Sequence, residues 1–87
     1  MGRLERVGLG TVYCRVGAVL TEMGGESLLA AIDAFSQGLL ADDFLNPAIK
    51  AGCVFFRGQA LEKTGAPPAE FMADYRKAIA IDPTHVE

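Results

Sequence analysis

The sequence has little of what marks several large protein classes. Its 87 residues include no tryptophan, one histidine and two cysteines, and eight scattered basic residues are outnumbered by eleven acidic ones. A net charge of −3 without a basic stripe disfavours nucleic-acid binding, because such proteins bind phosphates through clustered lysine and arginine. Apolar runs such as residues 16–20 are far shorter than the roughly 20 residues of a membrane helix. No signal-peptide or myristoylation pattern is present, so we expect a cytoplasmic protein without a membrane partner.

Residues that could perform chemistry are equally sparse. Cys14 and Cys53 stand in separate apolar runs without a CxxC pattern, so we expect buried free thiols rather than a disulfide or a metal site. His85 lies in the tail, where solvent is its expected partner. Asp42 and Asp43 are adjacent and therefore point in different directions at a helix end. The sequence predicts no catalytic residue, no cofactor and no metal, and the protein is not expected to be an enzyme.

Apolar residues, in contrast, are abundant. They make up 51% of the chain, whereas a domain of this size buries only about 60–65% of its unfolded surface. The core is therefore thin for the amount of apolar material. Some of that material is expected to be buried against another chain, with a stable four-helix monomer as the alternative.

Four apolar segments follow the helical spacing of three and four residues. Their predicted faces are Leu9, Val12, Tyr13, Val16, Leu20 and Met23; Leu28, Ile32, Phe35 and Leu39; Leu45, Ile49, Cys53, Phe56 and Ala60; and Phe71, Tyr75, Ala78 and Ile79. A strand is the alternative for the first segment, because it contains β-branched residues and several glycines. Short connections predict that consecutive helices are antiparallel neighbours. The expected fold class is all-α, with about four helices in two antiparallel pairs.

Turn-forming residues separate the four segments. Gly24–Gly25 divides the first two, and Asn46–Pro47 has the pattern of an N-cap followed by a first-turn proline. The stretch 65–68, Gly-Ala-Pro-Pro, precedes the last segment. Asp82–Pro83 predicts its end, because proline cannot extend a helix and biases the preceding residue away from helical angles. Gly8 and Gly10 form only a fragment of a phosphate-loop pattern.

An internal repeat relates the two halves of the chain. Gly17 and Gly58 are 41 residues apart, and so are Gly24 and Gly65. A small residue in the first helix of each half lets the second helix approach closely, and an aromatic of the second helix fills the space beside it. The repeated features are Tyr13-x-x-Val16-Gly17-x-x-Leu20, Ala31-x-x-x-Phe35 and Gly38 in the first half, and Gly58-x-x-Leu61, Gly65, Tyr75-x-x-Ala78 and Ile81-Asp82-Pro83 in the second. This pattern resembles the tetratricopeptide repeat.

The resemblance implies a right-handed solenoid fragment within a single domain, residues 1–87, with repeats at 9–43 and 46–83. Each repeat of such an array buries its face against its neighbours, and two units without a recognisable cap imply a homo-oligomer, most simply a dimer. The resemblance also implies a non-catalytic protein–protein interaction module or scaffold that binds a peptide or a partner subunit. The alternative is an unrelated four-helix domain that serves as a nucleic-acid-binding regulator or as a small subunit of an enzyme complex.

In such arrays the first helix of each pair forms the inner surface. The residues expected there are Cys14, Ala18, Thr21, Phe55, Gln59, Glu62 and Lys63, which make a mostly apolar groove with a mixed-charge lip. The residues expected at a self-association seam are Phe55, Phe71, Ile79 and Ile81. Because Phe55 and Phe56 are adjacent, we expect one in the core and the other as an anchor in the groove or seam. The alternative is that both are partly buried between helices.

Overall fold

The computed structural model describes residues 8–83, and these residues form four α-helices and no strand. Helix α1 spans Leu9–Met23, α2 spans Ser27–Ala41, α3 spans Pro47–Lys63 and α4 spans Pro68–Ile81. The all-α class with four helices is confirmed, and the alternative of a strand in the first segment is wrong. No helix within residues 8–83 has the length and apolar content to cross a membrane. His85 lies outside the described residues.

The helix ends fall where the turn residues predict them. The Asn46 side-chain oxygen accepts a hydrogen bond from the backbone N–H of Ile49 at 3.0 Å, and Pro47 is the first residue of α3. This is an N-cap followed by a first-turn proline, as expected. At the other end of the chain, α4 stops at Ile81, directly before the Asp82–Pro83 pair.

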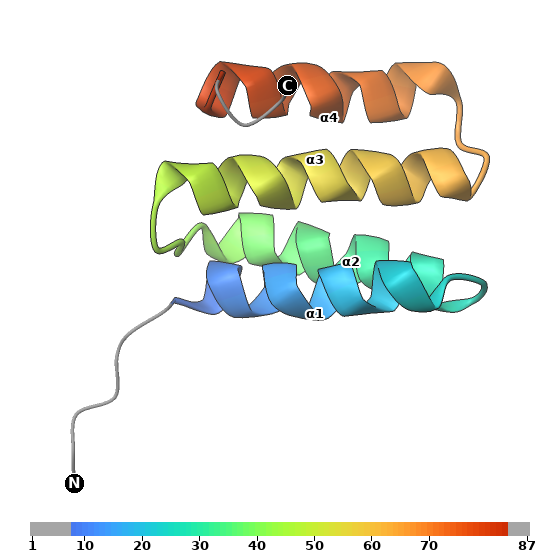
Figure 1. The fold of residues 1–87 in the computed structure, drawn as a ribbon, viewed down its shortest axis with the longest axis horizontal. Coiled ribbons are helices and arrows are strands. Elements are labelled where there is room, and N and C mark those ends of the chain that lie inside the picture. The colour runs from blue at the N-terminus through green and yellow to red at the C-terminus, as the bar shows by residue number, and fades with distance from the viewer. Residues whose placement is uncertain (1–7, 84–87) are drawn as a thin grey trace, which may run out of the picture.

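The helices lie side by side, with α3 between the α1–α2 hairpin and α4 (Figure 1). Along α1 and α2 the chain runs in opposite directions, because Gly38 contacts Gly10 and Tyr13 whereas Phe35 contacts Gly17. Helix α3 packs against both α1 and α2, and among the described helices α4 packs only against α3. Helix α3 is therefore the element that joins the two pairs.

A glycine–aromatic contact fixes the approach of the helices in each pair. A Cβ atom on Gly17 would lie 2.6 Å from the Phe35 ring, and one on Gly58 would lie 2.8 Å from the Tyr75 ring. Both distances are shorter than van der Waals contact, so only glycine fits at either position without movement of the ring. The predicted small-against-aromatic contact is present in both halves.

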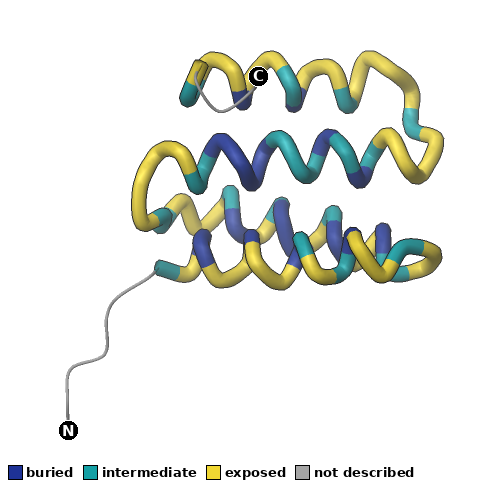
Figure 2. The backbone as a smooth tube through the Cα atoms, in the orientation of Figure 1, coloured by how far each residue is buried: buried dark blue, intermediate teal, exposed yellow. Residues whose placement is uncertain are grey.

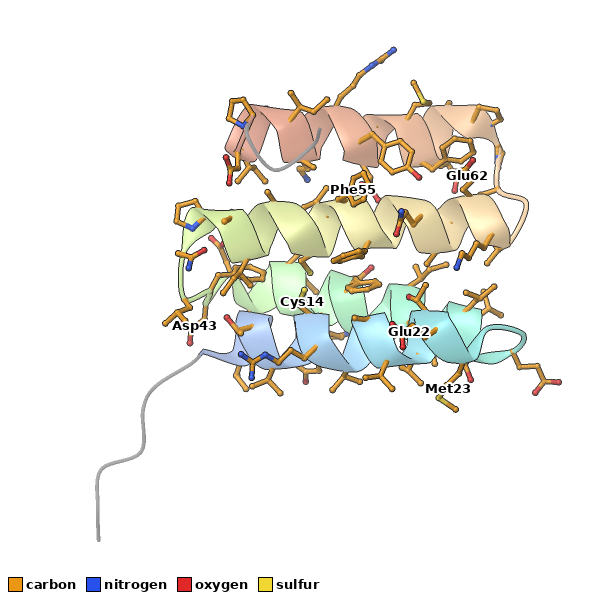
Figure 3. All side chains as sticks on the ribbon, viewed as in Figure 1. Cys14, Glu22, Met23, Asp43, Phe55 and Glu62 are labelled. Atoms are coloured by element: carbon orange, nitrogen blue, oxygen red, sulfur yellow. The ribbon has the colours of Figure 1, made fainter. Side chains whose placement is uncertain are left out.

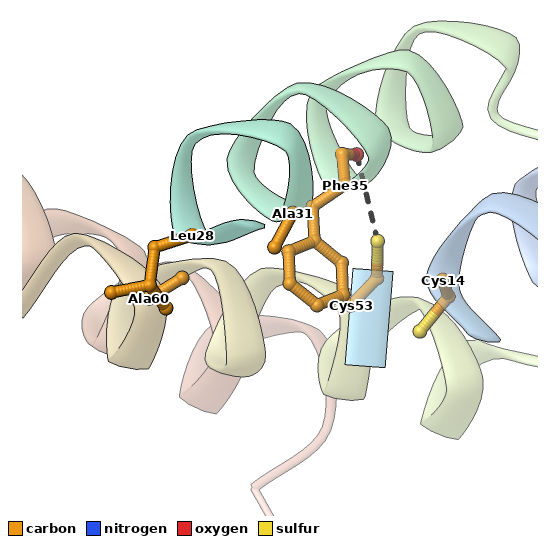
Figure 4. Packing of buried hydrophobic residues seen from close by; sticks show 6 residues of the cluster. All are labelled: Cys14, Leu28, Ala31, Phe35, Cys53 and Ala60. Carbon is orange, nitrogen blue, oxygen red and sulfur yellow. Dashed lines mark hydrogen bonds between the residues drawn. The ribbon is translucent and has the colours of Figure 1, made fainter. Parts of the chain in front are cut away.

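The core is centred on the inner face of α2 and on α3. Its fully buried large side chains include Phe35 and Val54. Figure 4 shows the Cys53 thiol pointing at the Phe35 carbonyl oxygen, to which it donates a hydrogen bond at 3.6 Å. The buried hydrophobic cluster consists of Cys14, Leu28, Ala31, Phe35, Cys53 and Ala60. The cysteines are buried free thiols, as predicted.

Helix α1 turns its small residues inward, opposite to the expectation from its apolar periodicity. Its buried residues are Gly10, Thr11, Cys14, Gly17 and Thr21. The predicted face is instead largely solvent-exposed, since Leu9, Val12, Tyr13, Val16 and Met23 are 36–67% accessible. The physical reason is the close approach of the neighbouring helices, which leaves room only for small side chains. Figure 2 shows this exposed outer side of α1.

The connection between α2 and α3 is tied to the start of α1. The backbone N–H of Gly10 donates to the Asp43 carbonyl at 2.9 Å, and the backbone N–H of Leu45 donates to the Thr11 hydroxyl at 3.0 Å. Gly8 has a φ of 85°, and its Cα faces the same Asp43 carbonyl. The glycines that suggested a fragment of a phosphate loop therefore make a close backbone contact.

Candidate functional site

A groove lies between α1 and α3, the first helices of the two pairs. Its cavity measures about 370 Å³, within the range of small-ligand and side-chain pockets. Four residues from each helix line it, namely Thr11, Cys14, Arg15 and Ala18 from α1, and Ala48, Ile49, Gly52 and Phe56 from α3. The groove is thus built by two helices that are separated in the sequence by α2.

The chemistry of the groove is mainly apolar. Ile49 and Phe56 supply bulk, whereas Ala18 and Gly52 leave space between the helices. The Thr11 hydroxyl already accepts the backbone N–H of Leu45. Arg15 is exposed at the rim, and its guanidinium pairs with no carboxylate among residues 8–83. Such a cavity suits an apolar side chain of a partner, with a cation available at its edge.

On α1, two of the three residues expected at the inner surface line this cavity. Cys14 and Ala18 do so. Thr21 is buried, and its hydroxyl donates to the Gly17 carbonyl at 2.8 Å. Its hydrogen bond is therefore made within α1 and not in the cavity. Arg15 was missed, although it stands beside Cys14 in the sequence and its charge marks a solvent-facing position.

On α3, the residues expected at the inner surface lie on two neighbouring helix faces. Gln59 and Lys63 follow Phe56 by three and seven residues, so they continue its helix face beyond the cavity. Phe55 and Glu62 belong to the neighbouring face, which meets α4, and are not groove residues (Figure 3). The Glu62 carboxylate accepts a hydrogen bond from a tyrosine hydroxyl on α4 at 2.8 Å.

The two adjacent phenylalanines are both partly buried, as the alternative interpretation expected. Phe56 lines the groove and packs against the core cluster. Phe55 instead stacks on Tyr75, with ring centroids 5.3 Å apart. The sequence contained a signal for this difference, because Phe55 lies one turn before Gly58 and therefore shares the helix face that meets α4.

The residues expected at a seam on α4 do not form a continuous apolar surface. Phe71 is partly buried, and its ring lies 5.9 Å from that of Tyr75. Ile79 is 45% exposed, but the charged Arg76 precedes it by three residues on the same helix face. Ile81 lines a second cavity of about 440 Å³, together with Asp42, Phe44, Leu45, Asn46, Pro47 and Lys50.

A partly buried ion pair, which the sequence alone did not indicate, ties three helices together. Arg57 donates from Nε and Nη2 to the two carboxylate oxygens of Asp74, both at 2.8 Å. Its Nη1 donates to the Ser36 hydroxyl at 3.3 Å. The hydrogen bonds to the carboxylate raise the pKa of Arg57 above its ordinary value. Arg57 and Asp74 directly neighbour Gly58 and Tyr75, so the glycine–aromatic contact was the signal that could have paired them.

The thiols of Cys14 and Cys53 influence each other beneath the groove. Interaction with the Cys53 thiol lowers the pKa of Cys14. Interaction with Cys14, together with burial, raises the pKa of Cys53. The Cys53 S–H donates its hydrogen bond to the Phe35 carbonyl. The pair is a polar spot in an otherwise apolar floor.

The Tyr75 hydroxyl gives a prediction on pH. Burial, followed by the hydrogen bond to Glu62, raises its pKa from 10.0 to about 12. The neutral phenol is thus favoured by folding, so its contribution to stability is complete below pH 10 and is lost as the pH rises through about 12. The chain has two tyrosines and no tryptophan. In Tyr13→Phe, the ultraviolet absorbance of tyrosinate should therefore report Tyr75 alone, with a midpoint near 12.

Two matched measurements control this titration. Glu62→Gln in the same background should move the midpoint down toward 10, because the carboxylate that accepts the hydrogen bond of the phenol and repels the tyrosinate charge is gone. Unfolding in denaturant should move it to the ordinary value. A folded protein that already titrates at the ordinary value would contradict the contact.

Metal chemistry finds no support in the described part of the chain, where no three His, Cys, Asp or Glu side chains gather in a way that could hold an ion. Comparisons with protein-family models, curated proteins and solved structures gave no match to this chain.

Proposed function

We propose that the chain is a non-catalytic interaction module of the tetratricopeptide type, which binds a peptide segment or a partner subunit and also self-associates. The observation that carries the proposal is the groove between α1 and α3. The tetratricopeptide resemblance assigns the binding surface to the first helix of each pair, and these are the two helices that line the groove.

The helix packing supports a repeat. The proposed units 9–43 and 46–83 correspond to the pairs α1–α2 and α3–α4. In each pair a glycine of the first helix contacts an aromatic ring of the second helix. The first helix of the second pair packs on both helices of the first pair, and the last helix packs on its own partner only. Contact between immediate neighbours is the packing rule of repeat arrays.

The ligand that fits is an apolar side chain presented by an extended or helical segment. The groove has the volume for one large side chain and offers few hydrogen-bonding groups, so burial of apolar surface would supply most of the affinity. Free thiols in the floor suit a reducing compartment, and we propose a cytoplasmic location.

Panning of a peptide-display library against the immobilised protein tests the proposal. The affinity of selected peptides is then measured for the wild type and for two matched variants, Ala48→Glu and Ala69→Glu. Both alanines are exposed and follow the proline that begins a helix, but only Ala48 lines the groove. An acidic residue in the first turn favours helix formation, so both variants should fold.

Ala48→Glu should raise the dissociation constant at least about tenfold, because a carboxylate in an apolar pocket loses hydration. Ala69→Glu should leave it within about twofold of wild type. Failure to select any peptide, or an equal response of the two variants, would refute binding in this groove.

A further inference from the structure

The exposed apolar side chains of α1 follow a heptad pattern. Leu9, Val12, Val16, Val19 and Met23 recur at alternating spacings of three and four residues, which is the a/d repeat of a coiled coil. All five are 43–67% exposed, and Figure 3 shows Met23 pointing away from the other helices. The buried residues of α1 fall at the remaining positions of the heptad. We call these five residues the α1 stripe.

The two flanks of the α1 stripe differ in chemistry. Arg15 and Glu22, one heptad apart, occupy the same flanking position, g. Tyr13 and Leu20, also one heptad apart, occupy the opposite flanking position, e. In a parallel helix pair the g position faces e, so Arg15 would meet Leu20 and neither charge would meet an opposite charge on the partner helix. In an antiparallel pair g faces g, and Arg15 of one helix meets Glu22 of the other. The charges therefore favour the antiparallel pair.

We propose that α1 packs against α1 of a second copy of this chain, antiparallel and about a two-fold axis. The axis passes between Val16 and Val19, so that Val16 of one copy packs on Val19 of the other, and Val12 packs on Met23. The same register places Arg15 opposite Glu22 on one flank of the stripe, and Tyr13 opposite Leu20 on the other flank. The inference rests on the self-association in the proposed function and names the surface that performs it.

The area of the stripe is sufficient for a specific contact. Together with Tyr13, its residues are 36–67% exposed, which for side chains of this size gives roughly 500 Å² per copy, near the upper limit for the largest apolar patch of a soluble monomer. Burial on both copies would remove about 1,000 Å² from solvent, the lower bound for a specific interface. Helix α4 offers a smaller continuous apolar surface, because Arg76 lies between Met72 and Ile79 on the same helix face.

Light scattering coupled to size-exclusion chromatography, over a hundred-fold range of protein concentration, tests the proposal. The wild type should be dimeric at the upper end of the range. Val16→Glu, at the centre of the stripe, should be monomeric throughout. Leu40→Glu is the control, because this 80% exposed side chain lies on α2 outside the stripe. Circular dichroism should show wild-type helicity in both variants, since neither side chain is part of the core.

A charge exchange tests the antiparallel orientation. Arg15→Glu should weaken the dimer at least about tenfold, because two carboxylates then face each other, and Arg15→Glu with Glu22→Arg should restore it. A parallel dimer would not respond in this way, and that result would overturn the orientation.

The outcomes separate this inference from the proposed function. A dimer that persists in Val16→Glu would overturn the α1 seam and leave self-association standing through another surface. A wild type that is monomeric at every concentration would overturn the seam and self-association together, and would assign the stripe to a different partner. Peptide binding in the groove is measured independently of both results.

Discussion

Asp74→Ala is expected to lower the free energy of unfolding by up to about 3–5 kcal/mol, because it leaves the partly buried Arg57 guanidinium without its carboxylate. The Arg57 side chain is 21% exposed and that of Asp74 is 7% exposed, so solvent cannot replace the lost partner well. A small domain has a total stability of about 5–15 kcal/mol, and this variant should therefore be close to unfolding at 37 °C. Denaturant titration followed by circular dichroism measures the change.

Two further variants interpret the result. Asp33→Ala removes an exposed carboxylate from α2 and should change stability by less than about 0.5 kcal/mol. Replacing both members of the pair, Arg57→Leu with Asp74→Leu, should recover much of the loss, because no unpaired charge is then left buried. If Asp74→Ala costs no more than Asp33→Ala, the ion pair does not hold α3 to α4.

Phe35→Ala should be comparably destabilising, by about 3–5 kcal/mol, since a fully buried ring at the centre of the core is replaced by a cavity. The half-buried Phe71 provides the comparison, and Phe71→Ala should cost clearly less. The same denaturant titration applies. Equal losses at the two positions would contradict the location of the core on the inner face of α2.

The glycine–aromatic contact can be isolated with a double-mutant cycle. Gly17→Ala gains about 1 kcal/mol of helix propensity but places a Cβ 2.6 Å from the Phe35 ring, so we expect a net loss of stability. In the background of Phe35→Leu the ring is absent, and Gly17→Ala should become neutral or stabilising. Additive effects in the cycle would show that the contact does not limit the approach of α1 and α2.

Much of the fold could be predicted from local chemistry. Asn46 and Pro47 define a helix start by capping and by a fixed φ, and Asp82–Pro83 defines a helix end for similar reasons. These are short-range effects that need no knowledge of neighbours. The contact between Gly17 and Phe35 was also predictable, because a repeat showed that the same combination occurs twice.

The orientation of α1 could not be predicted from its periodicity. The helix has an apolar large-residue face and a small-residue face, and hydrophobicity alone favours burial of the former. The structure buries the latter, because Gly10 and Gly17 permit a closer approach to α2 than valine or leucine would. Which face of α1 is buried depends on the shape of the helices that pack against it, and the sequence of α1 alone does not contain this shape.

Of the residues that line the candidate groove, the sequence therefore indicated two on α1 and none of the four on α3. Cys14 and Ala18 were expected because the tetratricopeptide resemblance assigns the inner surface to the first helix of each pair, and in the structure both line the cavity. Phe55 was preferred over Phe56 without a tertiary reference, and the face of α3 is set by the contact of Gly58 with Tyr75. Buried ion pairs such as Arg57 with Asp74 are similarly invisible until the helices are placed together.

Chemical-shift mapping of the uniformly ¹⁵N-labelled protein with a selected peptide tests the central claim, binding in the groove between α1 and α3, most directly. We expect the largest changes at the backbone amides of Cys14, Ala18, Gly52 and Phe56, and no change on the outer face of α4. Changes concentrated on α4, or on the α2–α3 connection around the second cavity, would contradict the proposed binding site.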